Sequence, residues 1–123
     1  MVGRSIYKAI KKKNLFKIVE CNRKNLDFTN QKAVDTWFKK NKPEIVINAA
    51  GRVGGILDNY TYQPDYLYIN TMIGLNLINS SLKYNVKKLI NLGSACIYPK
   101  NVKQPIKENA LLSSQLEKSN EGY

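Results

Sequence analysis

One stretch decides the fold of this chain, Glu44-Ile45-Val46-Ile47-Asn48-Ala49-Ala50-Gly51-Arg52-Val53-Gly54-Gly55. Its first half is apolar on both faces of an extended strand, which is typical of a strand buried in a parallel sheet. Its second half is a turn of small residues, where glycines permit unusual backbone conformations and close approach to a ligand. The stretch therefore indicates an open α/β sheet that binds its ligand beyond the carboxyl ends of its strands.

Strands and helices alternate on both sides of this stretch. The apolar periodicity predicts helices over residues 2–13, 31–40 and about 64–84, and strands over 15–21 and 88–92. Strands that alternate with helices favour right-handed crossovers and a doubly wound parallel sheet. The chain contains no linker, repeat or low-complexity tract, so we expect one domain.

Two of the predicted helices carry more specific signals. Asn30 stands where a side chain can cap the helix over 31–40. In the long helix, one face is expected to be buried and to carry Tyr68, Met72, Leu75 and Ile78.

Composition excludes several classes of protein. The chain has 123 residues, of which 43% are hydrophobic, and this fits a small globular domain. No apolar run approaches the roughly 18 residues that span a bilayer, so we expect a cytoplasmic protein without a membrane partner. The chain has no His and only two cysteines, Cys21 and Cys96, which excludes a His-based triad or a disulfide framework and leaves no expected metal site.

The formal charge of +11 raises the alternative of a small basic nucleic-acid-binding domain. The basic residues are scattered, and their clusters at 11–13, 39–40 and 87–88 lie near expected helix ends. A nucleic-acid site would need aromatic residues exposed among the lysines, whereas Trp37, Phe38 and Tyr68 follow core-facing patterns. We therefore expect no nucleic-acid partner.

Reactive side chains gather in two short motifs, Gly93-Ser94-Ala95-Cys96-Ile97-Tyr98-Pro99-Lys100 and Ser119-Asn120-Glu121-Gly122-Tyr123. A ketone is reduced when hydride arrives on carbon while an acid protonates the oxygen. Tyrosine can donate that proton, and a serine hydroxyl can hold the developing oxyanion. Without further context, Ser94 is equally a polar residue at a strand end, Tyr123 a frayed terminus, and Cys96 a small buried hydrophobe.

With these motifs and the turn at Asn48–Gly55, the sequence resembles the extended short-chain dehydrogenases/reductases. It is most similar to the GDP-L-fucose synthase family, the NADPH-dependent GDP-4-keto-6-deoxymannose 3,5-epimerase/4-reductases. The continuation Arg52-Val53-Gly54-Gly55-Ile56 and the segment Cys96-Ile97-Tyr98-Pro99 carry this resemblance, which covers the whole chain. It implies an α/β fold with a partial Rossmann-like doubly wound parallel sheet and flanking helices, NADP as cofactor, a GDP-sugar substrate, and a homodimer at full length.

The resemblance also implies roles for particular residues. Ser94 and Tyr123 are expected to serve the carbonyl, and Cys96 to exchange protons at carbons 3 and 5, which suits a thiol whose pKa of about 8.5 can be tuned. Asn70 is expected to order the site, although it could equally be a surface polar residue. The residues implied to bind the cofactor are Gly3, Arg23, Asp27, Phe28, Ala50, Gly51, Arg52, Leu92 and Gly93.

Arg23 is implied to contact the 2′-phosphate of NADP, because a guanidinium fork matches phosphate oxygens. Asp27 and its neighbour Phe28 are implied to receive the adenine. The residues alone leave alternatives open: Arg23 and Asp27 also fit an ordinary polar loop, and Gly3 a helix start. Arg52 stands where this family commonly carries Lys.

By the same resemblance, residues 1–123 form a partial NAD(P)-binding domain. The first strand with its glycine-rich turn, the catalytic Lys four residues after Tyr123 and the substrate-binding region are expected to be missing. We therefore expect the isolated chain to be inactive and to bind NADPH weakly. Another NAD(P)-dependent nucleotide-sugar epimerase or dehydratase is the alternative of the same class.

Overall fold

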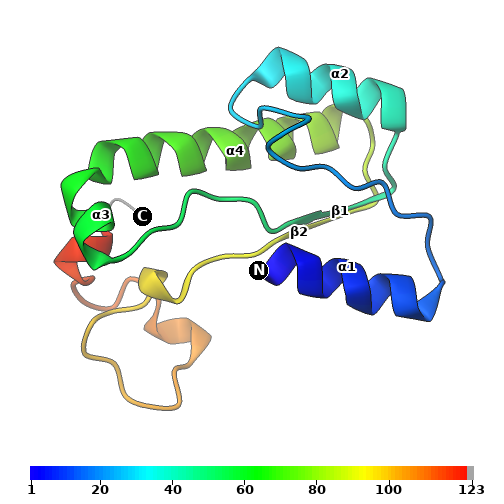
Figure 1. Ribbon diagram of the computed structural model, residues 1–123. Coiled ribbons are helices and arrows are strands. Elements are labelled where there is room, and N and C mark those ends of the chain that lie inside the picture. The colour runs from blue at the N-terminus through cyan, green and yellow to red at the C-terminus, as the bar shows by residue number, and fades with distance from the viewer. Residues whose placement is uncertain (122–123) are drawn as a thin grey trace. The chain divides into compact units, whose positions relative to one another are not determined.

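The computed structural model describes residues 1–121, which fall into two compact units (Figure 1). The sheet unit comprises Met1–Ala50 and Met72–Leu92. The loop unit comprises Gly51–Thr71 and the chain from Gly93 onward. The chain crosses from one unit to the other after Ala50, within a long helix, and after Leu92.

The sheet unit is built on two parallel strands, β1 (Ile45–Asn48) and β2 (Lys88–Asn91), with Ile45 opposite Lys88 and Asn48 opposite Asn91. Between them the chain passes through α3 (Ile56–Thr61) and α4 (Gln63–Lys83), the helical crossover that parallel strands require. The predicted α/β fold is thereby confirmed.

Both strands are less buried than their sequence predicts. Ile45 is 42% exposed and Ile90 37%, because the sheet of the described residues consists of these two strands alone. A strand in a parallel sheet becomes buried on both faces only when further strands and helices surround it.

Helix α2 (Gln31–Asn41) forms as predicted, with the predicted cap. The side-chain oxygen of Asn30 accepts a hydrogen bond from the backbone N–H of Ala33 at 3.1 Å. Val34 and Phe38, one turn apart on the same face, are fully buried and form the centre of the core. The Phe38 ring lies 6.4 Å from that of Tyr84, so α2 packs against the end of α4.

Helix α1 (Val2–Lys13) also matches its predicted bounds. It lies on the opposite side of the strand pair from α2, so helices flank both faces of the sheet as a doubly wound fold requires (Figure 1). None of its twelve residues is buried.

The strand predicted over residues 15–21 is wrong. The structure assigns no strand to this segment, because within residues 1–121 no neighbouring strand supplies the ladder of hydrogen bonds that would define one. Arg23 therefore does not follow a strand end but lies in a turn, where Asn25 and Leu26 donate backbone hydrogen bonds to the carbonyl of Asn22 at 3.1 and 3.0 Å.

The bounds of α4 agree with prediction, but its predicted buried face is wrong. Tyr68, Leu75 and Ile78 are each more than half exposed, and the buried residues are Tyr66, Ile73, Asn76, Leu77, Ser80 and Ser81. Both stripes satisfy helical spacing, because apolar residues surround most of this helix. Since Tyr68 is exposed, it does not support the exclusion of nucleic acid. Among the described helices, α4 included, none has the length and apolar character needed to cross a bilayer.

The loop unit contains α3, the first part of α4 and three single-turn 3₁₀ helices, η1 (Ala95–Ile97), η2 (Glu108–Ala110) and η3 (Lys118–Asn120). Tyr66 is the largest buried side chain among the described residues of this unit. The helix α3, which the sequence did not predict, packs against η3.

Candidate functional site

In the sheet unit, one buried side chain joins the ends of both strands. The Asn48 amide donates to the side-chain oxygen of Asn91 at 2.7 Å and accepts from the backbone N–H of Ala50 at 3.0 Å. The backbone carbonyl of Asn48 accepts from the N–H of Leu92 at 3.1 Å. Two residues predicted to bind the cofactor, Ala50 and Leu92, are therefore fixed to the same residue. Nothing in the sequence analysis singled out Asn48 itself.

The start of α1 lies beside the end of β1. A Cβ atom built on Gly3 would lie 3.6 Å from that of Ala49, which is an ordinary contact distance. Among residues 1–121 no side chain caps the first turn of α1, so its N–H groups and the positive end of its dipole remain available. A helix start at the carboxyl end of a parallel strand suits a pyrophosphate.

The loop after Arg23 is held by its own hydrogen bonds. One oxygen of Asp27 accepts from the Thr29 hydroxyl at 2.7 Å and from the Thr29 backbone N–H at 2.9 Å, and these bonds hold the pKa of Asp27 below its usual value. The Phe28 carbonyl accepts from the Asn76 amide of α4 at 2.9 Å. The carboxylate of Asp27 thus stabilises a local turn, and its role toward adenine stays a prediction.

In the loop unit, Asn70 of α4 fixes the turn that follows β1. Its side-chain oxygen accepts from the backbone N–H of Arg52 at 2.7 Å, and its amide donates to the backbone carbonyl of Arg52 at 3.2 Å. One side chain thereby satisfies both backbone groups of one residue. Asn70 therefore orders the turn at Arg52 and is not a free surface residue, and its part in a cofactor or substrate site stays a prediction.

The Arg52 side chain is engaged within the same unit. Its Nη1 lies 3.2 Å from a carboxylate oxygen of Asp65, and its Cζ lies 4.6 Å from the ring centre of Tyr66 and 5.7 Å from that of Tyr62. The guanidinium is therefore already held in place. If Arg52 contacts a cofactor, it must do so through the guanidinium N–H groups that Asp65 does not engage.

Position 54 requires glycine because the side chains of Tyr66 and Asp58 lie where a Cβ atom would be. The hydroxyl of Tyr66 donates to the Asp58 carboxylate, and a Cβ atom on Gly54 would collide with that hydroxyl and lie 2.5 Å from the Asp58 oxygen. The hydrogen bond to Asp58 and burial raise the pKa of Tyr66, so its phenol stays protonated. Tyr66 and Asp58 had no predicted role, because they are eight residues apart on two helices and their pairing leaves no local signal in the sequence.

Ser94 and Cys96 lie on one turn. The Ser94 hydroxyl oxygen accepts from the backbone N–H of Cys96 at 3.1 Å and caps η1. The hydroxyl keeps its own hydrogen and a second lone pair for a ligand. Both side chains are half-buried, and a Cβ atom on Gly93 just before them would meet open space.

Tyr123 lies outside the described residues. Cys21 is a second free thiol, and burial raises its pKa. Within residues 1–121 no group of metal-ligating side chains could hold an ion.

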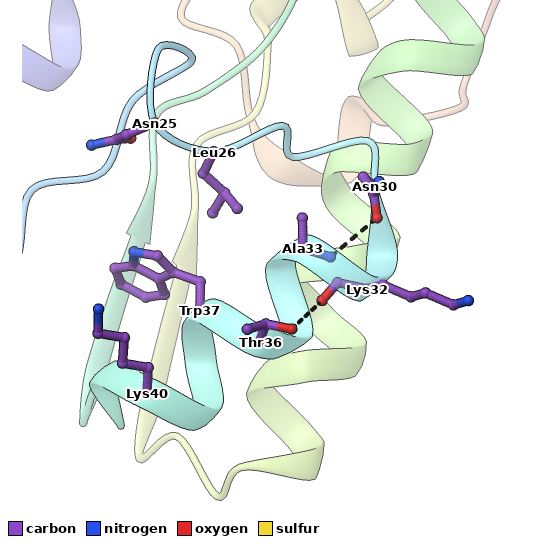
Figure 2. A pocket seen from close by; sticks show the side chains of 8 residues that line it. All are labelled: Asn25, Leu26, Asn30, Lys32, Ala33, Thr36, Trp37 and Lys40. Carbon is purple, nitrogen blue, oxygen red and sulfur yellow. Dashed lines mark hydrogen bonds between the residues drawn. The ribbon is translucent and has the colours of Figure 1, made fainter.

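A hollow of about 480 Å³ lies in the sheet unit between α2 and the loop at Asn25 and Leu26 (Figure 2). Figure 2 shows the Lys32 side chain pointing away from it. Two of its polar side chains are already bonded: the Asn30 oxygen accepts from the backbone N–H of Ala33, and the Thr36 hydroxyl donates to the Lys32 carbonyl. None of the predicted site residues within 1–121 lines this hollow, and it is not the candidate site.

The role of Asn70 can be tested through stability. We expect Asn70→Leu to lower the free energy of unfolding by about 1–3 kcal/mol, because both backbone groups of Arg52 lose their partner. Asn79→Leu, on the exposed side of the same helix, should change it by less than about 0.5 kcal/mol. Urea unfolding of the two variants measures the difference, and equal stabilities would show that the Asn70 hydrogen bonds contribute nothing.

Two parallel strands joined by a helical crossover, with small residues and an uncapped helix start at their carboxyl ends, define a dinucleotide-binding α/β fold. The model of the NAD dependent epimerase/dehydratase family matches residues 1–123, and the chain belongs to this family.

Its relatives include proteins named for one activity. The chain is 43% identical to GDP-L-fucose synthase 1 of Arabidopsis thaliana and 40% identical to GDP-L-fucose synthase of Escherichia coli K12, each over 123 residues. All of this chain is covered in both comparisons, but it spans only 38% of the length of either relative.

A solved structure shares the fold. MlghC, a GDP-mannoheptose C4 reductase from Campylobacter jejuni with NADP bound, superposes with a TM-score of 0.90 at 37% identity. The match covers 98% of this chain and 38% of that one.

Proposed function

We propose that this chain is part of an NADPH-dependent GDP-4-keto-6-deoxy-D-mannose 3,5-epimerase/4-reductase, an enzyme that makes GDP-L-fucose. The observation that carries the proposal is the identity of 40–43% along the whole chain to proteins named GDP-L-fucose synthase. Because the chain spans 38% of those relatives, we take residues 1–123 to be a partial NAD(P)-binding domain. The complete protein would be a cytoplasmic homodimer.

The residues present fit a dinucleotide. The uncapped start of α1 beside Ala49 suits the pyrophosphate, and Ala50 and Leu92 are fixed together through Asn48. Arg23 would select NADP over NAD by pairing with the 2′-phosphate, and NADP is the cofactor bound in MlghC. Gly3, Asp27, Phe28, Gly51, Arg52 and Gly93 complete the proposed cofactor site.

The bound cofactor would supply a hydride to carbon 4 of the keto-sugar. Tyr123 would give its phenolic proton to the carbonyl oxygen, and the Ser94 hydroxyl would donate a hydrogen bond to the same oxygen as negative charge develops on it. Cys96, on the turn that Ser94 caps, would exchange the proton on one face of carbons 3 and 5, where the neighbouring ketone acidifies the C–H bonds, and a second acid–base group would exchange the proton on the opposite face. Ser94 and Cys96 would thus act on adjacent atoms of one sugar ring.

A second candidate is a GDP-keto-heptose C4 reductase. It is favoured by the activity for which MlghC is named, since MlghC is nearly as similar to this chain as the GDP-L-fucose synthases are. Ser94 and Tyr123 would keep their roles at the carbonyl, and the sugar alone would differ. Since the two candidates share their cofactor chemistry, the substrate separates them.

Substrate-dependent NADPH oxidation by the full-length protein tests both candidates. We expect turnover with GDP-4-keto-6-deoxymannose, a product that has exchanged solvent deuterium at carbons 3 and 5, and a preference for NADPH over NADH. Turnover only with a 4-keto GDP-heptose, without exchange, would establish the second candidate. Absence of NADPH oxidation with either sugar, together with salt-sensitive oligonucleotide binding, would reject both and favour the basic nucleic-acid-binding alternative.

A further inference from the structure

Three helices and two strands of the sheet unit bring lysines to one edge. The last turns of α1, α2 and α4 and the first residues of β1 and β2 lie on the same side of this unit, on the right in Figure 1. This edge is opposite the carboxyl ends of the strands, where the proposed cofactor site lies. Its exposed lysines, which we call the basic edge, are Lys11, Lys12, Lys13, Lys39, Lys40, Lys42, Lys83, Lys87 and Lys88.

Few carboxylates offset the charge of the basic edge. Lys83 pairs with Asp35 at 2.7 Å, and Lys87 pairs with Glu44 at 2.6 Å. Among residues 1–121, the other lysines of the edge make no ion pair. Helix α1 contains no acidic residue. The edge therefore carries a net positive charge, in a chain whose formal charge is +11.

The helix ends explain only part of this charge. The C-terminal end of a helix carries about half a negative charge, which one lysine already offsets. The last turn of α1 has three lysines, and that of α2 has two, followed by Lys42. Lys42 has a φ of 44°, a left-handed conformation that favours Gly or Asn, and Asn14 and Asn85 occupy the corresponding positions after α1 and α4. The lysine at position 42 thus keeps a charge at a conformational cost.

Two apolar side chains accompany the lysines. Leu15 and Phe16 follow α1 directly and are 70% and 60% exposed. Lys13 and Lys17, which flank them in the sequence, are exposed as well. Apolar side chains that project among cations can enter the boundary between the headgroups and the acyl chains of a bilayer.

The type of cation favours a diffuse anionic surface over a nucleic acid. Arginine supplies the planar fork that recognises phosphates and base edges through paired hydrogen bonds, whereas lysine acts as a point charge. The arginines of this chain, Arg4, Arg23 and Arg52, do not belong to the basic edge. Lysines attract anionic lipid headgroups without needing that geometry.

We infer that the basic edge binds the surface of an anionic lipid bilayer, with Leu15 and Phe16 at the headgroup boundary. The expectation of no membrane partner rested on the absence of a run that spans a bilayer, and attachment to a membrane surface requires no such run. In this orientation the carboxyl ends of the strands face away from the bilayer. The inference does not depend on the proposed function.

Cosedimentation of the full-length protein with lipid vesicles tests the inference. Phosphatidylcholine vesicles with about 30% phosphatidylserine should bind the protein, and vesicles of phosphatidylcholine alone should not. Because salt screens exposed charges, raising its concentration from about 0.1 M to about 0.5 M should release most of the bound protein. Absence of binding to the anionic vesicles, equal binding to both kinds, or binding unchanged by salt overturns the inference.

A triple variant of the basic edge locates the contact. Replacing Lys39, Lys40 and Lys42 by glutamine should weaken binding to the anionic vesicles roughly 10–100-fold, because each lysine near such a surface strengthens binding severalfold. All three side chains are exposed. An unchanged midpoint of urea unfolding shows that the variant is folded.

The matched control removes the same charge from the loop unit. Lys103, Lys107 and Lys118 are also exposed, and their replacement by glutamine changes the net charge equally. This variant should bind the anionic vesicles within about threefold of the parent. Equal weakening in the two triple variants would show that net charge alone, and not the basic edge, attracts the protein, and would overturn the inference.

Leu15→Ser separates a bilayer from a nucleic acid. The variant lacks an apolar side chain that can enter the headgroup boundary, so its binding to the anionic vesicles should weaken about tenfold. Binding to a single-stranded oligonucleotide at the same phosphate concentration should not change, because the contact with its backbone is electrostatic. If the parent binds the oligonucleotide more tightly than the vesicles and Leu15→Ser changes neither affinity, the edge is a nucleic-acid surface and the inference is wrong. NADPH oxidation enters none of these measurements, so the proposed function stands or falls separately.

Discussion

Replacing Tyr123 by phenylalanine in the full-length protein is expected to slow NADPH oxidation by roughly 10²–10⁴-fold, the usual contribution of a general acid. Deuterium exchange into the sugar should continue at nearly the parental rate, because the phenol takes no part in proton removal at carbons 3 and 5. The loss should appear in kcat more than in the apparent KM for the sugar, as expected for an interaction made in the transition state.

Cys96→Ser should give the opposite result, a strong loss of exchange, because a hydroxyl hardly ionises near neutral pH. The substitution should leave the turn intact, because Cys96 contributes only its backbone N–H to the hydrogen bond with Ser94. Mass spectrometry of the recovered sugar after turnover in deuterated water measures the exchange. Parental exchange in Cys96→Ser would show that the epimerase role of Cys96 is wrong and would leave the reductase half of the proposal standing.

Phe38→Ala is expected to lower the free energy of unfolding by about 3–5 kcal/mol. The Phe38 side chain is 1% exposed and lies between the rings of Trp37 and Tyr84, with centroids at 5.5 and 6.4 Å, so its removal leaves a cavity that rigid neighbours cannot fill.

Urea unfolding of this chain measures the loss as a lower midpoint at an unchanged slope. Lys39→Ala, exposed on the same helix, is the control and should stay within about 0.5 kcal/mol of the parent. A loss below about 1 kcal/mol for Phe38→Ala would be incompatible with a core centred on Phe38.

The helices that were predicted correctly are determined by residues close to one another in the sequence. The bounds of α1, α2 and α4 agree with the apolar periodicity to within one residue, and the Asn30 cap is where the side-chain type placed it. Helix starts and ends depend on neighbours a few positions away, so the sequence can reveal them. The parallel pairing of β1 and β2 followed from the helical length of the crossover between them.

The predictions that were wrong concern contacts between distant segments. Residues 15–21 have strand-forming side chains but no partner strand within residues 1–121, and propensity cannot substitute for pairing. In α4, the buried face includes Asn76, Ser80 and Ser81, which a search for an apolar stripe passes over. Polar residues can be buried where neighbours pack over them, and composition alone does not show which ones.

The candidate site, like the fold, could be predicted only in part. Its residue types and their places after strand ends could be predicted, and Ala50, Leu92, Ser94 and Cys96 do follow β1 and β2. The hydrogen bonds that hold these loops could not be predicted from local patterns, because Asn48 binds Asn91 and Asn70 binds Arg52, 43 and 18 positions away in the sequence. Only the resemblance singled out Asn70. The roles assigned to the site residues stay predictions until the variants above are measured.

The hydrogen bonds that Asn48 makes at the ends of β1 and β2 have a consequence for protein engineering. Because one amide and its carbonyl fix where both loops leave the sheet, the loops beyond Ala50 and Leu92 start from the same two anchor points whatever their later sequence. These loops can therefore be exchanged between relatives. A loop taken from a relative with another sugar preference should leave the sheet at the same position if Asn48 and Asn91 are kept. Specificity could then be redesigned without disturbing the framework.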